Sequence, residues 1–496
     1  MARISDYRKT ICCLFLLCWS TLANAADLAI HNGRVMDPET GLDAIRHISI
    51  SDGKITEISR RKRKATRTID AKGLVVAPGF IDLHAHGQDP HSNEFQVADG
   101  VTTALELEIG VFPLNPWYAS REGKAPINYG ATVSHLAARL AVLSGQRIGN
   151  PVYAGNIAGG AGADYANTKL SAEQLQQLQN YLAEGLDDGA LGIGIGLAYV
   201  PGASAEEIYR VFELSAQHKG IVFIHLRQGR STSGDLLLPV QEALANAAAS
   251  SSALHIVHLN SSTDELAPAA LDMIRGAVGN GIDVTTESYP YTAGSTRLES
   301  ALFDDYQGDY NDLQWVATGE RLTQESFERY RAEGGWIIIH GRSERTNAYL
   351  VAQPDVMVAS DGIPFMDGFS HPRSAGTFAR VLGHYAREEK ALSLMDALRS
   401  MTLLPAKRLQ SLAPDMARKG RVQTGADADL TLFDPDRVSD RATYLQPAQA
   451  SVGIEYVIVN GVPVIDAGKL QPGVLPGRAI RGPTADPQAR HPKRPL

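Results

Sequence analysis

Eight short apolar segments, set apart by longer stretches with helical periodicity, constrain the fold of this chain more than any other feature. Helical spacing of apolar residues is clear over residues 171–188, 205–219 and 394–411. Strands that alternate with helices predict βα units and a parallel sheet. Eight such strands are the number that a closed barrel requires, so we predict an α/β fold with a TIM-type (β/α)8 barrel over residues 79–414. The eight predicted strands are Gly79 to Leu83, Val101 to Glu108, Ala131 to Ser134, Ala190 to Leu197, Ile221 to His225, Leu254 to His258, Asp283 to Glu287 and Asp355 to Ser360.

The two ends of the chain have a different sequence pattern, in which short apolar runs are separated by turn-forming residues. These runs fill residues 26–78 and return in residues 415–480. We expect both segments to form strands of one small β-sandwich that is built from the two ends of the chain. Residues 295–331 are polar and irregular, which predicts an insertion over the barrel mouth. Residues 481–496 are rich in Pro and Arg and are expected to form a disordered tail.

The first 25 residues resemble a secretory signal peptide. Arg3, Arg8 and Lys9 precede an apolar run from Ile11 to Trp19, and small residues for cleavage follow at 23–25. The alternative is a retained membrane anchor, but the run is shorter than the ~20 residues that span a bilayer. We therefore expect an exported, periplasmic protein without stable membrane insertion after cleavage.

Cleavage would change the composition that bears on function. All three cysteines, Cys12, Cys13 and Cys18, lie in the first 25 residues, so the mature chain has no disulfide and no thiolate ligand. The formal charge moves from −8 to −10, because the removed segment carries a net charge of +2. This modest acidity argues against a nucleic-acid partner. We expect a small-molecule substrate, and the sequence leaves self-association open.

Histidines stand at the ends of several predicted strands. His84 and His86 are two positions apart after an apolar strand, so both imidazoles point to one side. His225 and His258 each close another strand, and His255 is assigned a structural role because it faces the other side of its strand. Four imidazoles at the carboxyl ends of barrel strands suit one or two divalent metal ions, with zinc as the expected metal.

Carboxylates accompany these histidines. Asp361 ends the last predicted strand, where it could take a proton from a metal-activated water and return it to a leaving amine. Glu106 and Glu108 share one face of a strand that otherwise reads as core. We choose Glu108 as the anionic metal ligand because it is nearer the strand end, and Glu106 stays open.

The chain resembles the amidohydrolase superfamily and, within it, the N-acyl-D-amino-acid deacylases (D-aminoacylases). This resemblance implies that His225 and His258 bind the tight metal, that His84 and His86 serve a second metal, and that Asp361 is the general acid/base. It also implies substrate contacts from Tyr199, Tyr289, Ser295 and Arg373, with Arg373 suited to a carboxylate. The matching stretches are APGFIDLHAH at 77–86, GVTT at 100–103, YPYTAGST at 289–296, SDG at 360–362, HPR at 371–373 and GTFARVLG at 376–383.

Two positions depart from the family pattern. Residues 106–110 read Glu-Leu-Glu-Ile-Gly where D-aminoacylases carry a cysteine ligand, and Asn260 stands where they place a lysine. The leading hypothesis is hydrolysis of linear amides, deacylating N-acyl amino acids of D configuration through metal-hydroxide attack. A cyclic amidohydrolase of the dihydroorotase or hydantoinase kind is the alternative within the fold. An exported binding protein without catalysis is the alternative of another class.

Overall fold

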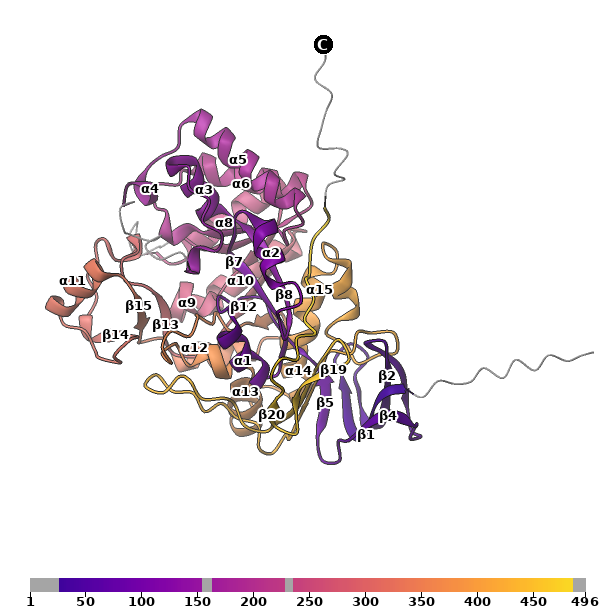
Figure 1. Cartoon of the computed structure of the whole chain (residues 1–496). Helices are drawn as coiled ribbons and strands as arrows, with labels where there is room; N and C mark the ends of the chain where they lie inside the picture. The colour runs from indigo at the N-terminus through magenta and orange to yellow at the C-terminus, as the bar shows by residue number, and fades with distance from the viewer. Residues whose placement is uncertain (1–25, 154–162, 228–234, 485–496) are drawn as a thin grey trace, which may run out of the picture.

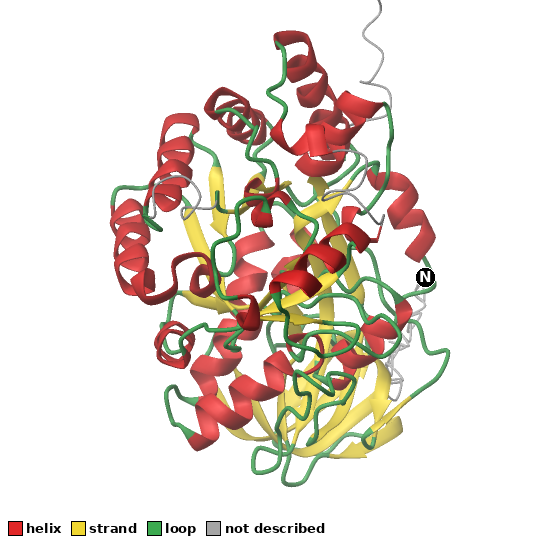
Figure 2. Cartoon of the chain, turned by 90° about the vertical axis from the view of Figure 1, so that its left-hand side faces the viewer, coloured by secondary structure: helices red, strands yellow, loops and turns green. Residues whose placement is uncertain are grey.

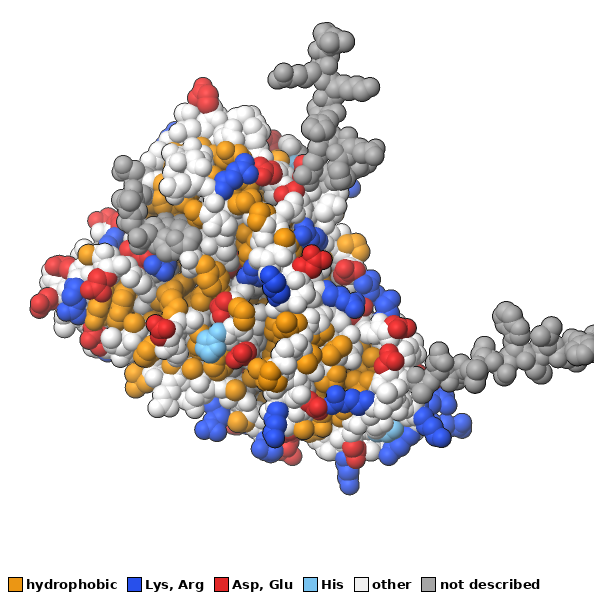
Figure 3. Space-filling model, in the orientation of Figure 1, with side chains coloured by type: hydrophobic (Ala, Val, Ile, Leu, Met, Phe, Trp, Pro, Cys, Tyr) orange, Lys and Arg blue, Asp and Glu red, His pale blue; other side chains and the backbone are white. Residues whose placement is uncertain are grey.

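The computed structural model describes residues 26–153, 163–227 and 235–484. Two bodies are visible in Figure 1: a helix-rich part, and a β-rich part in which indigo N-terminal strands lie beside yellow C-terminal strands. Turned by 90°, the β-rich part lies below the helix-covered barrel (Figure 2). Lys and Arg side chains are scattered among Asp and Glu side chains over much of the face in Figure 3.

An eight-stranded parallel sheet forms the barrel, and each strand overlaps one of the eight predicted segments. Its strands are β6 (Phe80–Asp82), β7 (Val101–Val111), β8 (Asn128–Ser134), β9 (Ile193–Gly196), β10 (Ile221–His225), β11 (Ala253–Ile256), β12 (Val284–Ser288) and β16 (Val356–Val358). Neighbouring strands pair in chain order, from β6 to β16. Just beyond the first and last strands, Ala85 and Gly362 form a parallel bridge that brings the two edges together. The predicted barrel is confirmed.

Helices cover the outside of this sheet because each presents an apolar face to the strands. The covering helices include α3 (His135–Ser144), α5 (Ala172–Asp187), α6 (Ala205–Gln217), α8 (Leu238–Ser250) and α10 (Ala267–Gly279), which share one hydrophobic core with the strands. Ser171 caps α5 through a capping box with Gln174, as its position before the apolar repeat predicts. The repeat over 394–411 forms α14 (Leu394–Leu398), a π-helical turn and α15 (Leu404–Leu409).

Both ends of the chain build one nine-stranded, mostly antiparallel sheet, which confirms the predicted second body. The early strands are β1 (Ala26–Asp37), β2 (Leu42–Ser51), β3 (Lys54–Ser59), β4 (Ala65–Asp70) and β5 (Val75–Pro78). The late strands are β17 (Leu430–Phe433), β18 (Ile454–Val459), β19 (Val462–Asp466) and β20 (Lys469–Leu470). The two groups join where β17 pairs with β5, and side chains of both groups share one core.

The predicted insertion at 295–331 has more regular secondary structure than its polar, irregular sequence suggests. Strands β13 (Gly294–Arg297), β14 (Leu313–Trp315) and β15 (Trp336–Ile339) form a small antiparallel sheet, and α11 (Gln324–Glu333) packs on it. The central strand, β15, lies beyond the range that we assigned to the insertion. Strands of three or four residues are too short to show a period of two.

The ends of the chain bear on two further predictions. Residues 1–25 lie outside the described residues, as do residues 485–496 of the predicted tail. The tail was predicted to begin at Arg481, yet residues 481–484 are described and contact the barrel: the backbone N of Gly482 donates to the carbonyl of Gly189 at 3.0 Å. Within the described ranges, no helix is both long and apolar enough to cross a membrane.

Candidate metal centre

His84 and His86 follow β6 directly, and buried contacts fix the backbone around them. The Asp82 carboxylate accepts from the backbone N of His84 at 3.1 Å and from that of Ser360 at 3.0 Å. The Nε2 atoms of His84 and His86 lie 3.1 Å apart, with the two rings at 90° to each other. Both side chains are buried. The two imidazoles therefore converge on one point, as their spacing predicts.

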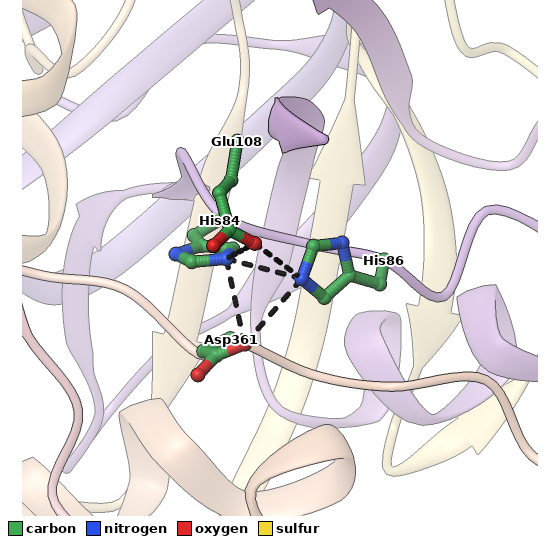
Figure 4. Close-up of side chains that lie close together, drawn as sticks. All are labelled: His84, His86, Glu108 and Asp361. Carbon is green, nitrogen blue, oxygen red and sulfur yellow. Dashed lines mark hydrogen bonds and ion pairs between the residues drawn. The ribbon is translucent and has the colours of Figure 1, made fainter. Parts of the chain in front are cut away.

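Two carboxylates complete this group (Figure 4). Glu108 reaches it from β7, with Oε2 at 3.0 Å from His84 Nε2 and 3.1 Å from His86 Nε2. Asp361 approaches from the opposite side, with Oδ1 at 3.4 Å from each of the same nitrogens. We call the group His84, His86, Glu108 and Asp361 the HxH position; its four ligand atoms lie within 4.8 Å of one another.

A second group shares Glu108. The other oxygen of Glu108, Oε1, lies 2.6 Å from Nδ1 of His225 and 3.4 Å from Nε2 of His258. These two imidazole nitrogens are 3.1 Å apart. We call the group Glu108, His225 and His258 the second position. Glu108 thus offers one oxygen to each position, which is the geometry of a carboxylate that bridges two ions.

Two of these residues have unusual backbone conformations. His258 and Asp361 have φ values of 32° and 51°, in the left-handed region that residues other than glycine rarely adopt. Each lies beyond its strand, since β11 ends at Ile256 and β16 at Val358. Such strain is typical of functional sites, where the surrounding structure enforces it.

Further carboxylates hold the outer nitrogens of the HxH pair. Glu287, at the end of β12, lies 2.6 Å from His84 Nδ1, and Glu106 lies 3.0 Å from His86 Nδ1. Glu287 also contacts His255 Nε2 at 3.1 Å. The structure therefore brings Glu106, the open alternative, to the outer side of His86 rather than into either ligand group. Sequence analysis did not single out Glu287, because its strand, Val-Thr-Thr-Glu-Ser, shows no apolar pattern against which a buried acid would stand out.

The charge balance of the HxH position is negative. Burial acts to lower the pKa of His84, but Asp361, Glu108 and Glu287 outweigh it and raise that pKa to about 10. Burial raises the pKa of Asp361, and the charges of Arg373 and His84 outweigh this effect, so the pKa lies below its usual value. The carboxylates therefore remain ionised around a point that favours positive charge.

The donor set fits a divalent transition metal at both positions. Every ligand atom is an imidazole nitrogen or a carboxylate oxygen, which are the ligands that such ions accept. A proton on Nδ1 of His84 and His86 can be donated to Glu287 and Glu106, which leaves each Nε2 lone pair free for a metal. His258 follows the same rule, with Nδ1 at 3.2 Å from the Ser262 hydroxyl.

Arg373 is the candidate substrate residue with the clearest relation to this centre. Its Nη1 lies 2.9 Å from Asp361 Oδ2, its Nη2 donates to the Ser295 carbonyl at 3.4 Å, and its Nε has no hydrogen-bond partner. The guanidinium also lies over the ring of Tyr289, 4.7 Å from the centroid. A buried cation with a free donor beside the metal ligands is suited to a carboxylate of a substrate.

The other two candidate substrate residues are Tyr199 and Ser295. The ring of Tyr199 is 5.0 Å from that of His225, and its hydroxyl accepts from Thr296 Oγ1 at 3.1 Å. Burial raises the pKa of Tyr199, which therefore stays protonated as a potential donor. The hydroxyl of Ser295 donates to the Ile337 carbonyl at 2.8 Å, so in this structure only its carbonyl faces Arg373.

Asn260, where the family resemblance predicts a lysine, joins the barrel mouth to α12 (Glu344–Val351). Its Nδ2 donates to the Tyr289 carbonyl and to Asn347 Oδ1, both at 3.0 Å. The side chain is buried, and its Oδ1 has no partner. Because Asn260 is neutral, the positive charge that a lysine at this position would place near Tyr289 is absent.

Comparisons with known proteins agree with this geometry. The chain is 31% identical to an N-acyl-D-glutamate deacylase of Alcaligenes xylosoxydans xylosoxydans, over 92% of this chain and 96% of that protein. The solved structure of N-acyl-D-glutamate deacylase from Bordetella bronchiseptica, complexed with zinc and a phosphonate inhibitor, superimposes with a TM-score of 0.78. It is 27% identical and covers 92% of this chain and all of that one. A D-hydantoinase structure reaches a TM-score of 0.60 at 17% identity, covering 92% and 99% of the two chains, and so shares the fold alone. Residues 67–465 match the family described as "Amidohydrolase family", and the chain belongs to that family.

Proposed function

We propose that this chain is a metal-dependent hydrolase that removes the acyl group from N-acyl-D-amino acids. The observation that carries the proposal is the convergence of Asp361, with Arg373 at 2.9 Å, on the imidazoles of His84 and His86. A proton acceptor, a carboxylate-binding cation and metal ligands thus meet at one point. The D configuration and the choice of zinc rest on the named relatives, an N-acyl-D-glutamate deacylase and a deacylase complexed with zinc.

Each residue of the centre has a defined task in this proposal. Bound divalent metal supplies a Lewis acid that polarises the amide carbonyl and makes water acidic enough to react near neutral pH. Asp361 takes the proton from the attacking water and delivers it to the departing nitrogen. Arg373 binds the substrate carboxylate and keeps Asp361 ionised until the proton arrives. Burial raises the pKa of Tyr199 and of Tyr289, so both hydroxyl groups stay protonated and can donate to the substrate.

The cyclic amide alternative has weaker support than the linear amide, because the dihydroorotase relatives match a smaller share of this chain than the deacylase does. The likeness to D-hydantoinase is a likeness of fold alone. None of the eight described barrel strands contains a lysine that could be carboxylated to bridge two metals, and Glu108 already lies between the two positions. The alternative of a binding protein without catalysis does not explain why Asp361, a potential proton acceptor, lies beside the metal ligands.

Hydrolysis of a substrate panel tests the proposal. The panel contains N-acetyl-D-amino acids, N-acetyl-L-amino acids, dipeptides and cyclic amides, each incubated with the zinc-loaded protein. We expect release of free amine from the N-acetyl-D-amino acids, and loss of that release in Asp361→Asn. The exposed Asp436→Asn serves as the matched control and should retain activity. Bound metal without turnover of any acyl amino acid would contradict the proposal.

We further propose that the protein is exported to the periplasm after cleavage behind Ala25. The charged start, the short apolar run and the small residues at 23–25 support this proposal. Intact mass measurement of the protein from a periplasmic fraction should give a chain that begins at Ala26. A cytoplasmic protein that keeps residues 1–25 would contradict it.

A further inference from the structure

The two metal positions differ in the number of ligands that the protein supplies. The HxH position has four ligand residues, two of them carboxylates, whereas the second position has three and shares its single carboxylate. The side chains of His84, His86 and Asp361 are 0%, 6% and 11% exposed, and those of His258 and His225 are 5% and 18% exposed. The fourth ligand and the second carboxylate both favour tighter binding of a divalent cation at the HxH position.

The groups behind the ligands widen this difference. Both imidazoles of the HxH position face a buried carboxylate through Nδ1, at 2.6 Å from Glu287 and 3.0 Å from Glu106. In the second position, the outer nitrogen of His258, Nδ1, lies 3.2 Å from the neutral hydroxyl of Ser262. Hydrogen bonds from carboxylates orient a ligating imidazole and make its free nitrogen a stronger donor.

Glu287 and Glu106 are themselves held in place and need a positive charge. Both are buried, and neither pairs with a lysine or an arginine among the described residues. Glu287 is fixed from behind by His255, which contacts Thr285 Oγ1 at 2.7 Å. Buried carboxylates are costly unless a positive charge lies near them. A metal ion bound through His84 and His86 would supply that charge, because these two imidazoles contact Glu287 and Glu106 directly.

We infer that in this chain the HxH position fills first and holds a divalent ion more tightly than the second position. Glu287 and Glu106 are the positioning residues that produce this order, through His84 and His86. The order is the reverse of the one implied by the resemblance to D-aminoacylases, in which His225 and His258 would bind the tight metal. The inference rests on the proposed metal requirement but not on any catalytic activity.

Cobalt binding to the metal-free full chain tests this order without an activity assay. Co²⁺ is titrated in and followed by its visible absorption, in competition with a chelator of known affinity. We expect Glu287→Gln and Glu106→Gln each to weaken the first equivalent by about 10- to 100-fold. Ser262→Ala, the matched change behind His258, should leave the first equivalent unchanged, and His225→Ala should abolish only the second. Loss of the first equivalent in His225→Ala, with wild-type affinity in Glu287→Gln, would overturn the inference.

A measurement on the unaltered protein guards against variants that fail to fold. Crystals of the wild-type protein loaded with less than one equivalent of Zn²⁺ are measured at the zinc absorption edge. We expect the anomalous peak between His84, His86 and Asp361. A peak confined to the space between His225 and His258 would overturn the order of filling, even if hydrolysis of N-acyl amino acids were established.

Discussion

Replacing Arg373 by methionine should remove the preference of the site for a free substrate carboxylate. Arg373 is buried, its Nε has no partner among the described residues, and its Nη1 pairs with the carboxylate of Asp361. A hydrogen bond to a charged group contributes about 1.5–3 kcal/mol. Since 1.4 kcal/mol is a factor of ten, the change should be about 10- to 150-fold.

The assay compares an N-acetyl-D-amino acid with its carboxamide, which has the same shape but no charge. The measured quantity is the ratio of kcat/KM for the acid to kcat/KM for the amide. Loss of the contact between Arg373 and Asp361 slows both substrates, so this effect cancels in the ratio. We expect Arg373→Met to lower the ratio about 10- to 150-fold and Arg275→Met, which replaces a half-buried arginine of α10 and removes its ion pair with Asp355, to leave it unchanged. An equal loss on both substrates would refute the assignment of Arg373 to carboxylate binding.

Three further predictions concern the fold and the bridge. Glu207→Gln leaves the buried Arg139 without its counter-charge at 2.6 Å and should destabilise the protein by about 3–5 kcal/mol, measured as a lower Tm. The double variant Glu207→Gln with Arg139→Met should recover most of this loss. Equal Tm values for the single and double variants would contradict the prediction. Arg421 lowers the pKa of Glu39 to about 2, so its contribution to stability is complete above about pH 4.3 and disappears as the pH falls through 2. The Tm difference between wild type and Glu39→Gln should therefore shrink over that range, and a constant difference would be inconsistent with the ion pair. Because Glu108 offers an oxygen to both positions, Glu108→Gln should weaken both bound equivalents of Co²⁺ more than about 10-fold, and weakening of one alone would exclude a bridging role.

The barrel was predictable because parallel strands covered on both faces read as continuous apolar runs. The segment Ile221 to His225 is of this kind, and its final histidine marks the carboxyl edge of the sheet, as Glu108 does at the end of the less apolar segment Val101 to Glu108. The ligand groups could then be predicted, because the carboxyl ends of all parallel strands lie at the same edge of the sheet. Glu108 was preferred to Glu106 by its place on the strand, and the structure gives Glu108 the contacts to both positions.

What the sequence could not show depends on contacts between distant segments. Glu287 reaches His84 across the barrel, and no local pattern in residues 283–287 predicts that direction. The insertion forms its sheet only when β15 inserts between β13 and β14, so short polar strands looked irregular in isolation. The hydroxyl of Ser295 is used within that sheet, where sequence reasoning had directed it to a substrate.

The pairing of β17 with β5 also determines when this protein can fold. Strands β1 to β5 leave the ribosome first, but their edge stays open until residues 430–433 have been made. The last described segment then fits below the barrel, where the backbone N of Ile480 donates to the Tyr129 carbonyl at 2.7 Å. Contacts between such distant parts of a chain form slowly, because a long loop must close first. Folding is therefore coupled to completion of synthesis, and a nascent chain that stops before residue 430 lacks the strand that joins the early and late strands of the nine-stranded sheet.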